Sequence, residues 1–203
     1  MIRDLFYDFV DLLEIVFLEP LRFPEEMKEI PLANGSSMHW VFAALSALSI
    51  ATGMSLLSPP YTIGTIGFLI FGFFSNLIAI RFFPFIFVII FDYYAQGKGR
   101  NAKVAVLLSY ARHSVLIFIL FAPVCTVLQS IGFGGRGIGI LVLIAHLLIY
   151  SLLVGRGAKY IYDLKDKDAF KFGYTALGLS ILFPLLFNLY TATTILQSLA
   201  GDF

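Results

Sequence analysis

Five stretches of this chain are long and apolar enough to cross a lipid bilayer, and they constrain its fold more than any other feature. A transmembrane helix needs about 20 mostly apolar residues at a rise of about 1.5 Å each. The stretches cover about residues 38–57, 62–95, 104–130, 137–154 and 172–198. We therefore expect an all-α, polytopic integral membrane protein, in which residues 38–203 form a bundle of about five transmembrane helices.

The composition agrees with this fold class and argues against several functions. Of the 203 residues, 59% are apolar and 13% are charged, whereas soluble domains are about half apolar and about a quarter charged. The net charge of +1 gives no basic field for nucleic acid, so we expect no nucleic-acid partner. The one cysteine, Cys125, allows no intrachain disulfide, and no Cys/His cluster predicts a metal or another cofactor.

Residues 1–19 have the pattern of an amphipathic helix ahead of the membrane domain. Apolar residues recur at helical spacing along one face, and Pro20 ends the pattern. Four acids lie on the opposite face: Asp4, Asp8, Asp11 and Glu14. An acidic face disfavours anionic lipid, so we expect this helix to pack on the bundle at least as readily as to lie on the membrane. With its polar connector it forms an N-terminal region, residues 1–37.

The second membrane stretch carries the strongest irregularity of the sequence. It is too long for a perpendicular crossing, and it contains Arg81 and Pro84. We expect one kinked or tilted helix, or a second half at the interface. An arginine at the bilayer centre costs about 2.5–3.5 kcal/mol, so Arg81 either snorkels to the surface or binds an anionic group. Pro123 and Pro184 predict kinks in two further spans.

Basic residues predict the orientation of the chain. In a five-span arrangement twelve of them fall on one side of the membrane, and Arg136 alone falls on the other. Because cytoplasmic loops are rich in Lys and Arg, we expect a cytoplasmic N-terminus and an outside C-terminus. Splitting residues 62–95 into two crossings would put the basic turn at residues 97–103 outside and spoil this asymmetry.

Two groups of charged residues are the candidate binding sites. One group would meet an anionic group or a lipid headgroup: Arg81, Lys98, Arg100, Lys103 and Arg112. The glycine-rich turn that holds three of these residues lacks the spacing of a nucleotide-binding loop. The second group alternates in sign, which is typical either of a solvated helix face or of a cytoplasmic docking surface. It comprises Arg156, Lys159, Asp163, Lys165, Asp166, Lys167 and Asp168.

No catalytic motif is present, and we expect no enzymatic activity. His39, His113 and His146 are far apart in the sequence, and packed or interfacial histidines are the default interpretation. An intramembrane enzyme would require His39, His113 or Asp92 to converge. Two polar residues in or near the spans, Gln129 and Asn188, are typical of hydrogen bonds between membrane helices.

Four short segments resemble the Yip-domain family, named for proteins that interact with Ypt/Rab GTPases. They are Leu18-Glu19-Pro20-Leu21-Arg22-Phe23, Gly97-Lys98-Gly99 leading into residues 104–111, Pro123, and residues 153–160 followed by Lys167-Asp168-Ala169. The resemblance is closer to prokaryotic members. It implies a five-span protein of the prokaryotic cytoplasmic (inner) membrane, and it carries no catalytic residues.

These observations favour a non-enzymatic membrane scaffold or a subunit of a membrane complex. Its partners would be membrane lipids, another membrane protein, or further copies of the chain itself. The alternative is a small transporter or lipid-moving protein that uses Arg81 and proline-broken helices.

Overall fold

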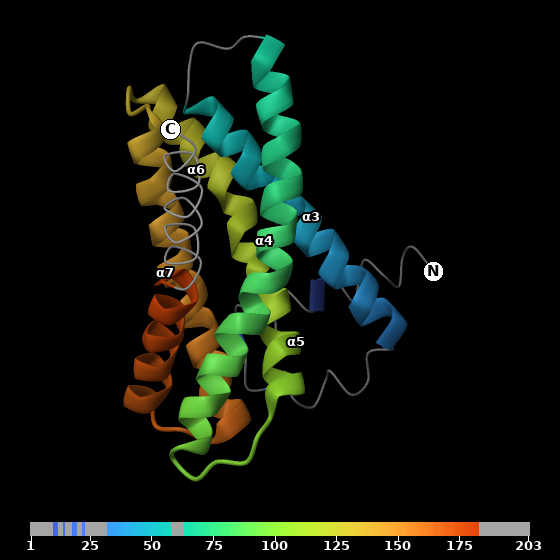
Figure 1. Cartoon of the computed structure of the whole chain (residues 1–203), viewed down its shortest axis with the longest axis vertical. Helices are drawn as coiled ribbons and strands as arrows, with labels where there is room; N and C mark the ends of the chain where they lie inside the picture. The colour runs from blue at the N-terminus through green and yellow to red at the C-terminus, as the bar shows by residue number, and fades with distance from the viewer. Residues whose placement is uncertain are drawn as a thin grey trace, which may run out of the picture.

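The computed structural model describes residues 10, 11, 14, 18, 19, 22, 32–57 and 63–182. Every regular element within these residues is helical, which confirms the predicted all-α fold. In chain order they are α3 (Leu32–Leu56), α4 (Ile63–Gln96), α5 (Val104–Ser114), the 3-10 helix η1 (Val115–Leu120), α6 (Phe121–Ser130) and α7 (Arg136–Tyr162). A further helix covers residues 166–182. Figure 1 shows α3 crossing the long helix α4 obliquely, with the first half of α3 to the right of α4. α7 and helix 166–182 lie to the left of α4.

Four helical segments of the described chain are long and apolar enough to span a membrane, so the protein is an integral membrane protein. They are Met38–Leu56, Ile66–Gln96, Val104–Ser130 and Gly137–Tyr162. Helix 166–182 covers the start of the fifth predicted span, at 172–198. The rest of that span, with Pro184 and Asn188, lies outside the described residues, as does most of the predicted helix 1–19.

The second membrane stretch is one continuous helix, which decides between the single helix and the two segments that the sequence left open. α4 runs for 34 residues, or about 50 Å, whereas the hydrocarbon core of a bilayer is about 30 Å thick. Pro84 lies inside this helix. Arg81 lies close to its midpoint, so the side chain has to reach along the helix to find a polar environment.

The third membrane stretch consists of three helical pieces, and a serine of α3 satisfies the backbone where they join. Pro123, in the first turn of α6, has no N–H to donate to the carbonyl of Ile119 four residues earlier. The Ser49 hydroxyl donates to that carbonyl at 2.7 Å and accepts from the N–H of Ala122 at 2.9 Å. This single side chain therefore holds α3 against the break and keeps the freed backbone group paired.

Helix α7 continues eight residues beyond the predicted end of the span at 154, through part of the charged segment. Two small residues make this possible, because Gly155 packs against the backbone of Ala169 and Gly157 packs against the ring of Tyr110. Arg156 projects to the exposed side between them. Hydropathy predicts where the apolar stretch ends, at the first charged residues. The helix continues beyond that point because its charged residues lie on the exposed face.

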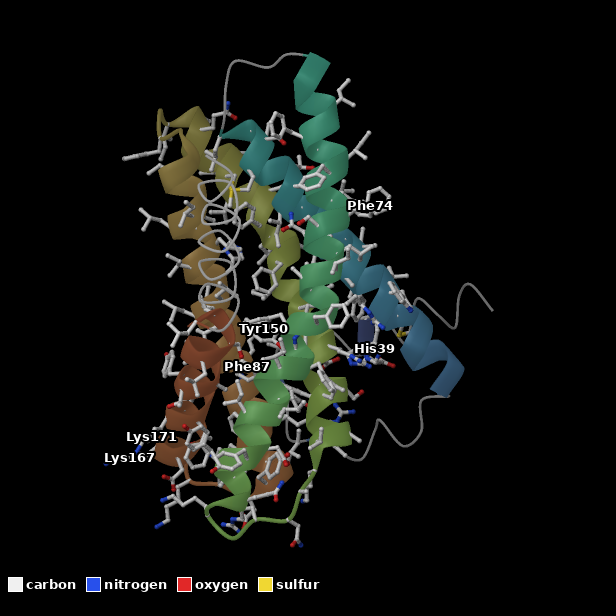
Figure 2. The ribbon with its side chains drawn as sticks, in the orientation of Figure 1. His39, Phe74, Phe87, Tyr150, Lys167 and Lys171 are labelled. Carbon is white, nitrogen blue, oxygen red and sulfur yellow. The ribbon has the colours of Figure 1, made fainter. Side chains whose placement is uncertain are left out.

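Aromatic rings fill the centre of the bundle, while other rings face outward. Tyr150 is fully buried, contacts Phe83, Phe87 and Phe118, and donates a hydrogen bond from its hydroxyl to the carbonyl of Ala111 at 3.2 Å. Figure 2 shows Phe87 and Tyr150 within the bundle and Phe74 on its periphery. The outward-facing apolar side chains of α4 suit a lipid environment, where large exposed apolar surfaces carry no hydration cost.

Candidate anion-binding site at the membrane interface

Two ion pairs bring the charged turns of the chain to one end of the bundle. Lys98 Nζ lies 3.3 Å from Asp168 Oδ1, and Arg100 Nη1 lies 3.3 Å from Asp163 Oδ2. At the other end, the N–H of Gly135 donates to the carbonyl of Leu57 at 2.7 Å. We call the end with the two ion pairs the basic end; it lies at the bottom of Figure 1.

A buried carboxylate ties the basic end together. Asp92 is 3% exposed and accepts hydrogen bonds from the Tyr162 hydroxyl, the Gln96 amide and the backbone N–H of Lys103. The Lys103 ammonium reaches the carbonyl of Ile161 at 2.6 Å. These bonds connect α4, the 97–103 turn and α7, so they hold the two basic turns in a fixed relation.

The candidate docking residues are largely paired with the chain itself. Asp163 and Asp168 bind the 97–103 turn, and Asp166 lies 2.8 Å from the Lys159 ammonium. Among the described residues, Lys165 and Lys167 are exposed without an ion pair. The segment therefore offers positive charge to its surroundings, although its sequence reads as alternating in sign.

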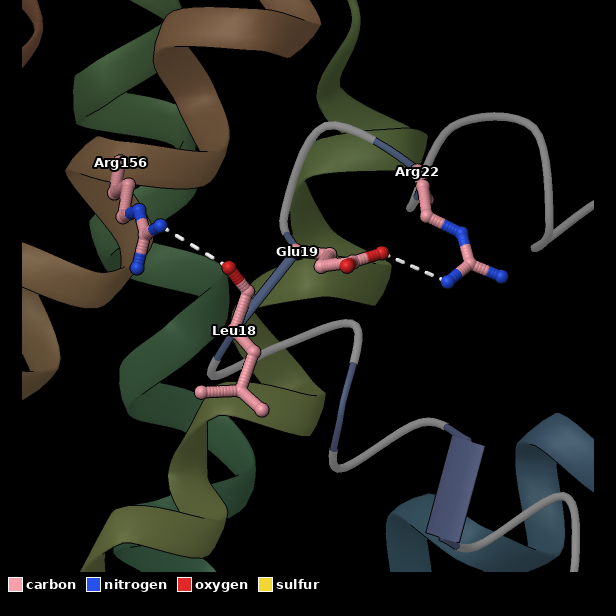
Figure 3. A network of polar contacts seen from close by, with 4 residues as sticks. All are labelled: Leu18, Glu19, Arg22 and Arg156. Carbon is pink, nitrogen blue, oxygen red and sulfur yellow. Dashed lines mark hydrogen bonds and ion pairs between the residues drawn. The ribbon is translucent and has the colours of Figure 1, made fainter.

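Arg156 is directed to the N-terminal segment. Its guanidinium donates to the carbonyl of Leu18 at 3.1 Å, and Arg22 pairs with Glu19 at 2.7 Å next to this contact (Figure 3). At least one backbone group of the N-terminal region therefore contacts α7.

A second cluster lies on the flank formed by α3, α4 and α5. The Arg81 guanidinium stacks over the Trp40 ring, with 4.0 Å between Cζ and the ring centroid. Trp40 is 51% exposed, and tryptophan is enriched where the membrane meets water. Arg112 of α5 lies close enough to Arg81 and His39 for its charge to act on both. Two cationic side chains from separate helices thus lie on the same flank of the bundle.

Two histidines separated by 74 residues meet in the same cluster. His39 Nε2 lies 3.1 Å from His113 Nδ1, which also lies 2.8 Å from the carbonyl of Ser109. A carbonyl oxygen only accepts, so the contact with Ser109 requires a proton on His113 Nδ1. In the contact between the two rings, His39 Nε2 is therefore the acceptor. His39 is therefore unprotonated at that nitrogen and adds no positive charge there. Asp92 is committed to the network at the basic end and His146 to the carbonyl of Val142, so neither joins this pair.

Arg81 and Arg112 have no carboxylate partner among the residues that the structure describes. The Nε atom of Arg112 is buried and has no hydrogen-bond partner there. The five cations that the sequence grouped together thus divide in two. Lys98, Arg100 and Lys103 bind acceptors of the chain, whereas Arg81 and Arg112 share one flank and have no carboxylate partner in the described part of the chain.

The lengths of the helices agree with a position of this flank near a bilayer surface. Arg112 precedes the end of α6, at Ser130, by 18 residues, and Arg156 follows the start of α7, at Arg136, by 20. At the rises of α- and 3-10 helices each distance is about 30 Å, the thickness of the hydrocarbon core. When Ser130 and Arg136 lie at one bilayer surface, Arg112 and Arg156 reach the opposite surface. Arg81 extends toward that opposite surface from the middle of α4.

Comparison of the chain with protein-family models found no match, and comparisons with curated proteins and with solved structures found none either. The resemblance to the Yip family stays a prediction. No group of three metal-ligating side chains lies together in the described part of the chain. Sequence reasoning missed the roles of Trp40 and of the His39–His113 contact. A tryptophan at the start of a span was the one available signal, because it is typical of a helix entering at the interface.

Proposed function

We propose that this chain is a non-enzymatic integral membrane protein that organises the membrane around it, as a scaffold or a subunit of a membrane complex, by holding an anionic lipid headgroup between Arg81 and Arg112. The observation that carries the proposal is that these two arginines lie on one flank beside Trp40, and that neither has a carboxylate partner among the described residues. Two positive charges held near each other in an apolar setting repel, and an anion that contacts both offsets this repulsion. A phospholipid supplies that anion at the depth where Arg112 lies.

The chemistry of the cluster favours a phosphate group. A guanidinium presents a planar fork of N–H donors that matches phosphate oxygens bidentately. The Trp40 ring covers one face of the Arg81 guanidinium and leaves the N–H groups at its edge free for an anion. The half-exposed ring also suits the headgroup region, so a lipid approaching from the bilayer would meet the tryptophan and the arginine together.

In the orientation we propose, the basic end lies on the cytoplasmic side of a prokaryotic inner membrane. The described lysines of the turn at 97–103, of α7 and of helix 166–182 gather there, as cytoplasmic loops require. The exposed Lys165 and Lys167 would then face an anionic leaflet, where each lysine contributes about 1 kcal/mol of attraction. The resemblance to the Yip family, whose members have a cytoplasmic N-terminus, supports the same orientation.

A second candidate function is lipid movement or solute transport through the bundle. Its support is the position of Arg81 near the middle of α4, three residues before Pro84. Intramembrane cations mark many transport sites, and a proline inside a membrane helix leaves a carbonyl that can line such a site, although α4 continues through Pro84. In this alternative the Arg81–Arg112 pair is a relay for an anionic headgroup crossing the bilayer, and it holds no resident lipid.

Native mass spectrometry of the detergent-solubilised protein tests the proposed function. We expect the wild type to retain phosphatidylglycerol in preference to phosphatidylcholine. In Arg81→Gln/Arg112→Gln we expect one bound phosphatidylglycerol to be lost, with its affinity falling about thirtyfold because two charges are removed. The matched control is Lys165→Gln/Lys167→Gln, which removes the same charge from exposed, unpaired positions. Equal losses in both double variants would mean that phosphatidylglycerol responds only to net charge, and the proposal would fail.

Liposome reconstitution separates the two candidates. A scaffold gives no transbilayer movement of a fluorescent phosphatidylglycerol above protein-free vesicles. A lipid-moving protein gives fast movement that Arg81→Leu abolishes while the variant remains folded by circular dichroism. Fast movement in the wild type would overturn the scaffold proposal.

A further inference from the structure

A groove opens at the basic end on the other flank of α4, between the last turns of that helix and helix 166–182. Its volume is about 430 Å³. Its rim and wall are formed mainly by Tyr93, Tyr94, Lys98, Lys171, Phe172 and Thr175. Twelve residues of α4, or about 18 Å, separate Tyr93 from Arg81. Figure 2 shows His39 and Lys171 on opposite sides of lower α4, so the groove is distinct from the Arg81–Arg112 cluster.

The groove has a cationic rim and no acidic residue in its lining. Lys171 is exposed and has no ion pair among the described residues. Lys98 pairs with Asp168 at 3.3 Å but keeps half of its side chain exposed, so two of the three ammonium donors remain available for a second acceptor. The Thr175 hydroxyl is occupied by the carbonyl of Lys171 at 2.8 Å, which leaves the lysines as the charged donors.

Aromatic rings form the wall of the groove below the lysines. Tyr94 stacks on Phe172 with 5.8 Å between centroids and 22° between ring planes, and Tyr93 meets Tyr94 edge-to-face at 5.6 Å. Tyr93 is 72% exposed. Tyrosines and snorkelling lysines together are typical of the level at which a helix leaves the hydrocarbon. Gly155 packs against Ala169, which puts Arg156 of α7 close to the same level.

From this arrangement we infer that the groove binds the phosphate of an anionic phospholipid between Lys98 and Lys171, with the glycerol backbone and the first acyl carbons against Tyr93 and Phe172. The wall is apolar and the rim is cationic, so the groove complements an amphiphile. A free phosphate would use the rim alone and leave the wall hydrated. The inference rests on the membrane location in the proposed function, and it does not depend on the Arg81–Arg112 cluster.

Lipid titration by native mass spectrometry tests the groove separately. In an Arg81→Gln/Arg112→Gln background, we expect one phosphatidylglycerol to remain bound, and Lys171→Gln to weaken its binding about fivefold. Lys165→Gln is the matched control, because it removes one exposed lysine six residues away and leaves the groove intact. Since Lys171 has no partner in the described chain, Lys171→Gln should leave the thermal unfolding of the protein unchanged.

Three results would overturn the inference. The first is an equal loss with Lys165→Gln, which would indicate diffuse attraction to the basic end. The second is displacement of the lipid by millimolar inorganic phosphate or glycerol phosphate, which would identify a soluble anion as the ligand. The third is the absence of bound phosphatidylglycerol in the arginine background. Loss of one lipid from the Arg81→Gln/Arg112→Gln variant, with a second lipid still bound in the groove, would support the proposed function and this inference separately.

Discussion

The guanidinium of Arg81 lies 4.0 Å above the ring of Trp40, and this contact joins the middle of α4 to the start of the α3 span. An arginine within an apolar helix would otherwise bear the full cost of its charge. Stacking on an interfacial tryptophan offsets part of that cost, by about 0.5–2 kcal/mol depending on desolvation. The rest requires an anion or water, because the described residues provide no carboxylate for it.

Replacing Arg81 by leucine should separate stability from lipid binding. We expect Arg81→Leu to unfold in detergent at the same temperature as the wild type or higher, because the substitution removes an insertion cost of about 2.5–3.5 kcal/mol. Retention of phosphatidylglycerol should fall in the same preparation. A large loss of thermal stability would instead make Arg81 a structural residue. Arg81→Lys keeps the charge without the planar fork, so its retention of phosphatidylglycerol should lie between that of the wild type and that of Arg81→Leu.

Replacing Asp92 by asparagine, which has the same size but no charge, should lower the stability of the protein. Three donors converge on its carboxylate, and an amide can offer only one oxygen while its NH₂ faces a donor. We expect Asp92→Asn to lower the free energy of unfolding by about 1–3 kcal/mol, measured by denaturant titration. Asp166→Asn, which breaks an exposed ion pair, should cost below about 1 kcal/mol. Equal effects would argue against a special role for the buried carboxylate.

Ser49 should matter more than an exposed hydroxyl, because it bonds twice at the break in the third membrane stretch. Ser49→Ala leaves the Ile119 carbonyl and the Ala122 N–H without this partner, and we expect a loss of about 1–2 kcal/mol. Thermal unfolding of the detergent-solubilised protein measures it. Thr126→Ala, whose hydroxyl bonds only within its own helix, is the control. A silent Ser49→Ala would show that lipid or water pairs these groups equally well.

Gly157 should not tolerate a methyl group. A Cβ at this position would lie 2.3 Å from Cε1 of the Tyr110 ring, and that ring is fully buried. We expect Gly157→Ala to lower the free energy of unfolding by about 1–3 kcal/mol through overpacking. Gly67→Ala, in the exposed part of α4 where the added Cβ meets no described atom beyond its own stretch of helix within 4 Å, should cost nothing. Unfolding monitored by tryptophan fluorescence from Trp40 compares the two variants.

The sequence predicted the fold class because lipid imposes a coarse rule on it. Apolar stretches of about 20 residues identify spans even when it is unknown which helices contact each other. The distribution of Lys and Arg argued against two crossings within residues 62–95, but it did not decide between one helix and two segments. The end of α7 was misplaced, since the charge of Arg156 hides the small residues that let the helix continue. The 3-10 helix before Pro123 had no signal beyond the proline itself.

The residues of the candidate site could be selected from the sequence, but which of them lie together could not be predicted. Arg81 and Arg112 were both selected as cations near a membrane, together with three others that turned out to bind the chain itself. Only the packing of α3, α4 and α5 separates the two sets, because it decides which cations reach a carboxylate or a carbonyl. The contact of His39 with His113 spans 74 residues, and no local pattern encodes it.

Solid-state NMR of the protein in phosphatidylglycerol-containing membranes tests the central claim most directly, by measuring dipolar contact between lipid ³¹P and ¹³C-labelled guanidinium carbons. The Arg81–Arg112 site predicts guanidinium signals that ³¹P dephases strongly in the wild type, and that disappear in Arg81→Gln/Arg112→Gln while the other arginine signals remain. Dephasing that is unchanged in the double variant would show that no lipid phosphate lies between these two side chains.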